Sequence, residues 1–319
     1  MTGVQTCALP ISGDPTYDPQ AGGQEYIQSH IQFQIDGKII CKGTPEARIV
    51  FKSAAEVPHY TDWQGIYVRH GVFEYVEISH AICGIAAGNN FEKLTVENSY
   101  IHNIWAAGIG FNNPADPNTQ SFVKHTTIED CGHEAVDTHS PGKLELSYNL
   151  VKKCQTGFNL HDFMEATVHH NLVLDTCFPI LCVNASNVHA TQNTFARIFA
   201  QDVSRWTYNG YTMPQQTNPA GVFIPNSGTT HIIFTNSIIV DSPCGLRSDS
   251  TSSTLENGYL NFDNVINNYV GSVTPGVGIT QYVSGFVNAA NDDYHLTDAS
   301  PLKGIGNPAD GSPDLGAYG

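Results

Sequence analysis

The strongest constraint on the fold is an internal repeat of about 22 residues, because self-similarity at a fixed period indicates stacked structural units. Each unit holds two apolar landmarks. One is a leading strand with two apolar positions one residue apart, and the other is a trailing strand that opens with a small residue. The leading landmarks are Val76/Ile78, Leu94/Val96, Thr126/Ile128, Leu144/Leu146, Ala166/Val168, Val188/Ala190 and Ile232/Phe234. The trailing landmarks are Gly84-Ile85, Gly108-Ile109, Ala135-Val136, Gly157-Phe158, Pro179-Ile180, Gly221-Val222 and Gly245-Leu246.

The spacing of these landmarks predicts a solenoid. The second leading positions are separated by 18, 32, 18, 22, 22 and 44 residues, where 32 contains the insertion FNNPADPNTQS and 44 is twice 22. A middle apolar position lies between the two landmarks, at Ile101, Val151, Val173, Phe195 and Ile239. Three short alternating strands per coil can enclose a narrow apolar core. We therefore predict an all-β, single-stranded right-handed parallel β-helix.

Two further columns follow from this register. The inward residues Ile85, Ile109, Val136, Phe158 and Ile180 should stack one strand spacing apart. The turn after the leading strand should carry stacked polar side chains, since Asn and Asp tolerate left-handed backbone and amides bond along a stack. That turn is predicted at Asn98, Asp130, Asn149, Asn171, Asn193 and Asn236. A propeller would need a period nearer 40 residues, and a leucine-rich repeat would need leucine at fixed sites.

Several segments resemble known β-helix proteins. IDGKIICKGTPEARIVFKS (35–53), QGIYV (64–68) and FEYVEISHA (73–81) are similar to the N-terminal coils of bacterial right-handed β-helix proteins of the pectate-lyase-like superfamily. NDDYHLTDASPLKGIGNPADGSPDLGAYG (291–319) is similar to their closing segment. The resemblance implies secretion and contact with carbohydrate. It transfers no named activity, because the polygalacturonase pattern is reduced here to Gly132-His133-Glu134 and the Asp-Asp pair lies at Asp292-Asp293.

The first eleven residues, MTGVQTCALPI, read as the translation of a sequencing-library adapter. A short signal peptide is the alternative, but the segment has no basic start and no apolar core of roughly seven residues. We therefore predict three parts: a non-native segment at 1–11, the β-helix at 12–285 and a closing segment at 286–319.

Alternation along the trailing strand predicts a candidate site. If Val136 and Phe158 point inward, polar side chains from the two neighbouring coils meet on the outside. We call them the outward patch: Asp137, His139, Asn159, His161 and Asp162. Paired carboxyl groups beside histidine can catalyse glycoside hydrolysis. Two histidines with an aspartate can also bind a divalent metal ion, and a third interpretation is plain surface decoration.

Aromatic residues near the same corner are candidate sugar platforms. Trp105 precedes a trailing strand, and the insertion QDVSRWTYNGYTMPQQTNPA (201–220) brings Arg205, Trp206, Tyr208 and Tyr211 to that corner. Loop aromatics on a rigid scaffold often bind ligands. Alternatively, these side chains bury themselves over the corner. The FNNPADPNTQS loop is read as an ordinary turn, with Ca²⁺ left open as its ligand.

Charge limits the partners. The formal net charge of −16 repels nucleic acid and anionic membranes, and no apolar run reaches the roughly 18 residues of a membrane span. Cys131, Cys154 and Cys177, spaced by 23 residues, are read as buried small side chains. We predict a secreted monomer that degrades polysaccharide, as a hydrolase before a lyase, without a required cofactor. The rival function is a non-catalytic surface protein that binds glycan or extends from the cell.

Overall fold

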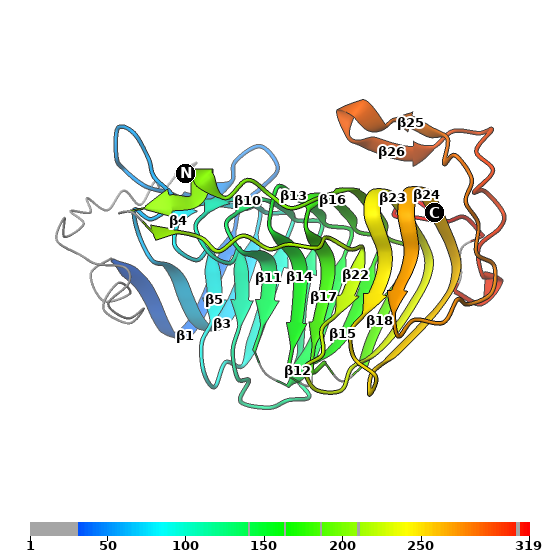
Figure 1. Ribbon diagram of the computed structural model, residues 1–319. Helices are drawn as coiled ribbons and strands as arrows, with labels where there is room; N and C mark the ends of the chain where they lie inside the picture. The colour runs from blue at the N-terminus through cyan, green and yellow to red at the C-terminus, as the bar shows by residue number, and fades with distance from the viewer. Residues whose placement is uncertain (1–30, 140, 163, 186, 209–210, 311–312) are drawn as a thin grey trace.

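The computed structural model describes residues 31–139, 141–162, 164–185, 187–208, 211–310 and 313–319. These residues form a right-handed parallel β-helix, which confirms the predicted fold (Figure 1). The described residues contain strands and three short 3₁₀ helices but no α-helix. None of the described helices has the length and apolar character that crossing a membrane requires.

Three parallel sheets run along the solenoid, one for each strand of a coil. The leading sheet contains β6 (Lys93–Glu97), β9 (Gln120–Lys124), β12 (Gly142–Ser147), β15 (Met164–His169) and β18 (Asn187–Thr191). The middle sheet contains β2 (Ile49–Phe51), β4 (Val76–Ala81), β7 (Tyr100–Ile104), β10 (Thr127–Cys131), β13 (Leu150–Lys152), β16 (Leu172–Thr176) and β19 (Thr194–Ile198). The trailing sheet contains β5 (Ile85–Ala87), β8 (Ile109–Phe111), β11 (Glu134–Thr138), β14 (Thr156–His161), β17 (Phe178–Val183) and β22 (Val222–Ile224).

Longer strands close both ends of the stack. β1 (Gln32–Lys42) and β3 (Gly65–Glu74) each run from the trailing sheet into the leading sheet of the next coil. β23 (His231–Ser248) and β24 (Thr254–Gly271) pass through all three sheets of one coil and pair with each other. The solenoid thus begins and ends on continuous strands.

The core lies between the sheets and confirms the predicted inward column. The strand pairing places Ile85, Ile109, Val136, Phe158 and Ile180 opposite one another in successive coils, and each is 0% exposed. Burying such side chains stabilises the fold by roughly 1.5–3 kcal/mol each. Cys131, Cys154 and Cys177 are buried free thiols, as predicted.

Two of the predicted leading landmarks were wrong. Ile78 and Ile128 both pair with Ile101, so they belong to the middle sheet. The leading sheet instead uses Phe73, 23 residues before Val96, and Val123, 23 residues before Leu146. The apparent spacings of 18 therefore arose from joining strands of two different sheets.

The predicted asparagine column was also partly wrong. Asn149, Asn171 and Asn193 do stack. Asn171 Oδ1 accepts from the backbone N–H and from Nδ2 of Asn149, and Asn193 Oδ1 accepts in the same way from Asn171, each at 3.0 Å. Asn98 and Asn236 occupy the preceding left-handed position, with φ of 51° and 47°. Asp130 lies at the next corner, between the middle and trailing sheets. Ser99, Thr126 and Ser237 continue the stack with hydroxyl oxygens.

Two segments leave the coil pattern. The insertion before β22 contains a 3₁₀ helix (Ser204–Trp206), β20 (Thr207–Tyr208) and β21 (Tyr211–Thr212), and it runs back along one edge of the solenoid (Figure 1). The C-terminal segment contains β25 (Phe286–Asn288), β26 (Asp293–Leu296) and 3₁₀ helices at Ala289–Asn291 and Pro308–Asp310. Arg197 holds it in place through ion pairs of 2.8 Å to Asp175 and Asp292. The predicted boundary at residues 11 and 12 lies outside the described residues, and the boundary at 285 stays a prediction.

Candidate functional site

The outward patch is built by two neighbouring strands of the trailing sheet. β11 and β14 pair in parallel with Val136 opposite Phe158 and Asp137 opposite Asn159. Because alternate side chains point to opposite faces, the inward Val136 and Phe158 place Asp137 and Asn159 on the outer face. The backbone N–H of His161 donates to Thr138 Oγ1 at 2.8 Å, which fixes the ends of the two strands against each other.

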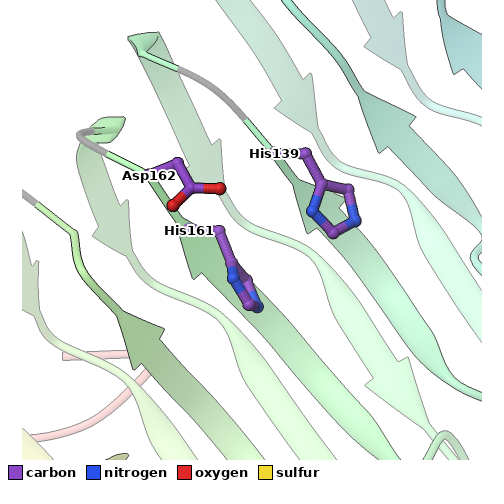
Figure 2. Close-up of side chains that lie close together, drawn as sticks. All are labelled: His139, His161 and Asp162. Atoms are coloured by element: carbon purple, nitrogen blue, oxygen red, sulfur yellow. The ribbon is translucent and has the colours of Figure 1, made fainter. Parts of the chain in front are cut away.

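His139, His161 and Asp162 converge where β11 and β14 end. Figure 2 shows the three side chains gathered on one side of the strands, with one potential ligand atom of each lying within 4.8 Å of the other two. The centroids of the two imidazole rings are 5.3 Å apart. Asp162 has a left-handed φ of 55°, a conformation that Asp tolerates better than most residues. This turn brings its carboxylate back beside the histidines.

Asp137 is much less exposed than a residue on the face of a sheet would suggest. It is 9% exposed, and its Oδ2 lies 2.6 Å from His139 Nε2. Asn159, 4% exposed, donates from Nδ2 to Asp137 Oδ1 at 3.1 Å. The Asn159 Oδ1 atom is buried and has no hydrogen-bond partner within the part of the chain that the structure describes. The structure thus brings all five patch residues together, but two of them are covered.

His133 and Glu134 extend the patch and were not among the predicted site residues. Glu134 is 3% exposed, accepts from Asn159 Nδ2 at 3.1 Å and pairs with His133. Strict alternation from Val136 would turn Glu134 inward, so the sequence pattern did not predict Glu134 as a residue of the outward patch. A charged carboxylate without a partner is too costly for an apolar core, so its charge was the signal that alternation fails at this corner.

The pKa values of the titratable residues in the patch are shifted in different directions. Burial raises the pKa of the Asp137 carboxyl, even though the hydrogen bond from His139 acts in the opposite direction. That hydrogen bond raises the pKa of His139, whereas burial lowers the pKa of His161. Burial also opposes the charge on His133, but its pairing with Glu134 raises the pKa of that imidazole overall. Neighbouring titratable groups are therefore pushed in opposite directions, which is common at functional sites.

Small residues leave space beside Asp137. The outward position of Asp137 is occupied by Ala86 and Gly110 in the two preceding coils and by Leu181 after Asn159. A Cβ atom added to Gly110 would meet only the Cys83 sulfur, at 4.0 Å. The outer face next to the Asp137 carboxyl is therefore open to a ligand.

Trp206 and Arg205 are packed against the scaffold. Trp206 is 0% exposed, and the Arg205 guanidinium lies 4.1 Å from its ring centroid. Arg205 also forms an ion pair of 2.9 Å with Asp130 and donates to the Lys153 carbonyl. Trp206 is therefore buried over the corner, which was the alternative to a sugar platform, and its ring faces are not available to a sugar.

The remaining insertion residues lie at the far end of the strands. The Tyr211 and Trp105 rings are 5.6 Å apart, and both residues are half-buried. The side chain of Tyr208 lies outside the described residues. The insertion bonds Gln155 and Thr156 through Pro214 and Gln216. Thr156 begins β14 and His161 ends it, so these contacts lie about 16 Å from the histidines at 3.3 Å per residue. The insertion thus stands at the Glu134 end of the patch, not beside the two histidines.

Comparison with family models supports the class of fold. Residues 59–195 match the family model for the right handed beta helix region. This match agrees with the right-handed parallel β-helix that the structure shows, as predicted. The crystal structure of pectate lyase Pel9A is similar, with a TM-score of 0.49 and 12% identity over 99% of this chain and 97% of that chain. A search of curated proteins finds no match.

Proposed function

We propose that this protein is a secreted polysaccharide-active enzyme, a hydrolase before a lyase, that acts at the outward patch. The observation that supports this most is Asp137, a carboxyl group that is largely withdrawn from water yet 2.6 Å from a histidine on an accessible face. Burying a carboxyl group is unfavourable unless it is paired. Such an arrangement is typical of groups that exchange protons.

Glycoside hydrolysis needs two carboxyl groups in different environments, one that donates a proton and one that stays ionised. Asp137 is the buried member, and burial favours its protonated form. Asp162, at the more open end beside His161, is the second carboxyl group. His139 lies next to both and can pass a proton between Asp137 and the solvent.

The shape of the face fits an extended chain of sugars. Gly110, which has no side chain, leaves room on one side of Asp137. No ion pair joins Glu134, Asp137 or Asp162 to a lysine or arginine among the residues described. Basic groups that would hold an acidic sugar are thus scarce at the patch, which favours a hydrolase that acts on a neutral polysaccharide.

A second candidate function is glycan binding without catalysis. The leading sheet carries a separate groove lined by Lys143, Glu165, His189 and His231, among others. Glu165 and His189 point outward there, and their exposed polar atoms can bond sugar hydroxyls. This groove lies on a different sheet from the outward patch, so the two functions can be separated by mutation.

The test is a panel of neutral and acidic plant and algal polysaccharides incubated with the full chain. Reducing-end release reports cleavage of either kind, and ultraviolet absorbance of unsaturated ends reports elimination. We expect reducing ends without unsaturated products, from at least one neutral polysaccharide. Binding with no product from any member, lost in Glu165→Ala and His189→Ala, would replace the enzyme by the glycan-binding protein.

A further inference from the structure

We infer that His139, His161 and Asp162 form a binding site for a divalent transition-metal ion of the zinc or iron(II) class. Two imidazoles and one carboxylate, each with a ligand atom within 4.8 Å of the others, supply three protein ligands. This donor set with open coordination positions is the one that catalytic zinc and non-haem iron sites use. Calcium is disfavoured, because it takes oxygen ligands.

The geometry needs only small side-chain movements to close around an ion. Ligand atoms 2.0–2.1 Å from a tetrahedral ion lie about 3.3 Å from one another. His139 directly follows β11 and His161 ends β14, and the backbones of these neighbouring strands are held about 4.8 Å apart by the sheet. The side chain of His139 is 53% exposed, so its ring can turn toward the other two ligands (Figure 2).

An independent contact orients His139 for metal binding. Metal-bound histidines usually donate their other ring N–H to a carboxylate, which fixes the ring and its tautomer. His139 Nε2 lies 2.6 Å from Asp137 Oδ2, and Asn159 holds that carboxyl from its other oxygen at 3.1 Å. A neutral imidazole that donates from Nε2 has its lone pair on Nδ1. The Nδ1 atom of His139 is therefore the one assigned to the metal.

The surrounding charge also favours a cation. Glu134 and Asp137 of β11, together with Asp162 just after β14, place three carboxyl groups in and beside the outward patch, on a chain whose net charge is −16. Three protein ligands leave at least one position for water or a hydroxyl group of a bound molecule. Metal binding here does not rest on the proposed polysaccharide activity. An ion would occupy His139 and Asp162, so the metal-bound state and the metal-free acid–base roles exclude each other.

The experiment is a titration of the untagged, chelator-treated full chain with Co²⁺ and Zn²⁺. Calorimetry measures the binding of both ions, and the visible spectrum reports bound Co²⁺. We expect one ion per chain. Affinity should fall at least tenfold in His139→Ala and in His161→Ala, and 10–100-fold in Asp137→Asn, which removes the orienting carboxylate. Thermal melts of the metal-free variants verify that they fold. Because the side chain of His139 is exposed, His139→Ala changes the site without changing the core.

Two matched controls separate this site from other histidines. His189→Ala removes an exposed histidine of the leading sheet, and His169→Ala disrupts the cluster of His169 with His170 and Glu145. Both should bind Co²⁺ as the unchanged chain does. The inference is overturned if His161→Ala binds normally, or if His169→Ala alone loses the ion. A metal-free chain that releases no product from any polysaccharide, yet binds Co²⁺ as expected, would overturn the proposed function and leave the metal site standing.

Discussion

Replacing Asn171 with alanine tests how the solenoid is held together. Asn171 is 0% exposed and lies in the middle of the asparagine stack. Its Oδ1 accepts from both the backbone N–H and the side chain of Asn149 at 3.0 Å. Its Nδ2 donates to the carbonyls of Leu146 and His169 and to Asn193 Oδ1, at 2.9–3.1 Å. Alanine removes all five bonds.

The expected loss of unfolding free energy is about 3–5 kcal/mol. Leaving the buried Asn149 N–H without an acceptor costs about 1–3 kcal/mol, and the other lost hydrogen bonds contribute about 1 kcal/mol each before the structure relaxes. Serine should restore part of the loss, because Ser237 in the same column accepts the Asn193 N–H at 3.0 Å. We expect Asn171→Ser to retain about 1–2 kcal/mol relative to alanine.

Urea denaturation followed by circular dichroism measures these differences. Asn267→Ala, which removes an exposed asparagine of β24, is the control and should change stability by less than about 0.5 kcal/mol. A loss below 1 kcal/mol in Asn171→Ala, or equal losses in the alanine and serine variants, would refute the reasoning.

Three further predictions follow from the site and its surroundings. Gly110→Leu should lower product release at least tenfold with an unchanged melting temperature, because it fills the face beside Asp137 at a position where an added Cβ atom meets only the Cys83 sulfur, at 4.0 Å; full activity would contradict the proposed position of the sugar. Trp206→Ala should cost about 3–5 kcal/mol of unfolding free energy, since the ring is 0% exposed; a loss of activity without loss of stability would restore its role as a sugar platform. Burial alone would raise the pKa of Glu129, but Lys153 and Lys152 lower it, so its pairing stabilises the fold above the unfolded pKa and is lost as pH falls through the folded pKa. Glu129→Gln should therefore weaken the fall in melting temperature on acidification, and an unchanged pH profile would argue against the pairing.

The trailing strands were predictable from the sequence because a small residue stands at or near the start of each. The trailing strands open on Gly84, Gly108 and Gly157, where a Cβ atom would come within 3 Å of a carbonyl oxygen in the next coil. That steric requirement kept the trailing column in register. The leading strands have no such marker, so Ile78 and Ile128 of the middle sheet passed for leading residues.

The sequence predicted the site residues where side chains alternate strictly along a strand, and it missed those where this alternation fails. Asp137 and His139 follow from Val136 by alternation, and Asn159 and His161 follow from Phe158 in the same way. Glu134 precedes Ala135 and Val136, which are both 0% exposed, so alternation breaks down at the start of this strand. The direction of the insertion could not be inferred either, because it depends on the burial of Trp206 against Gly132, a contact between segments more than 70 residues apart.

The central claim is that the carboxyl groups of the outward patch act on a polysaccharide. The most direct measurement compares product release by the unchanged chain, Asp162→Asn and Asp241→Asn. Asp162 and Asp241 both have a left-handed backbone, with φ of 55° and 52°, so the two substitutions make the same local change at different corners. We expect Asp162→Asn to lower the rate by a factor of about 10²–10⁴ and Asp241→Asn to leave it unchanged. Equal rates in all three proteins, with all three folded, would contradict the claim.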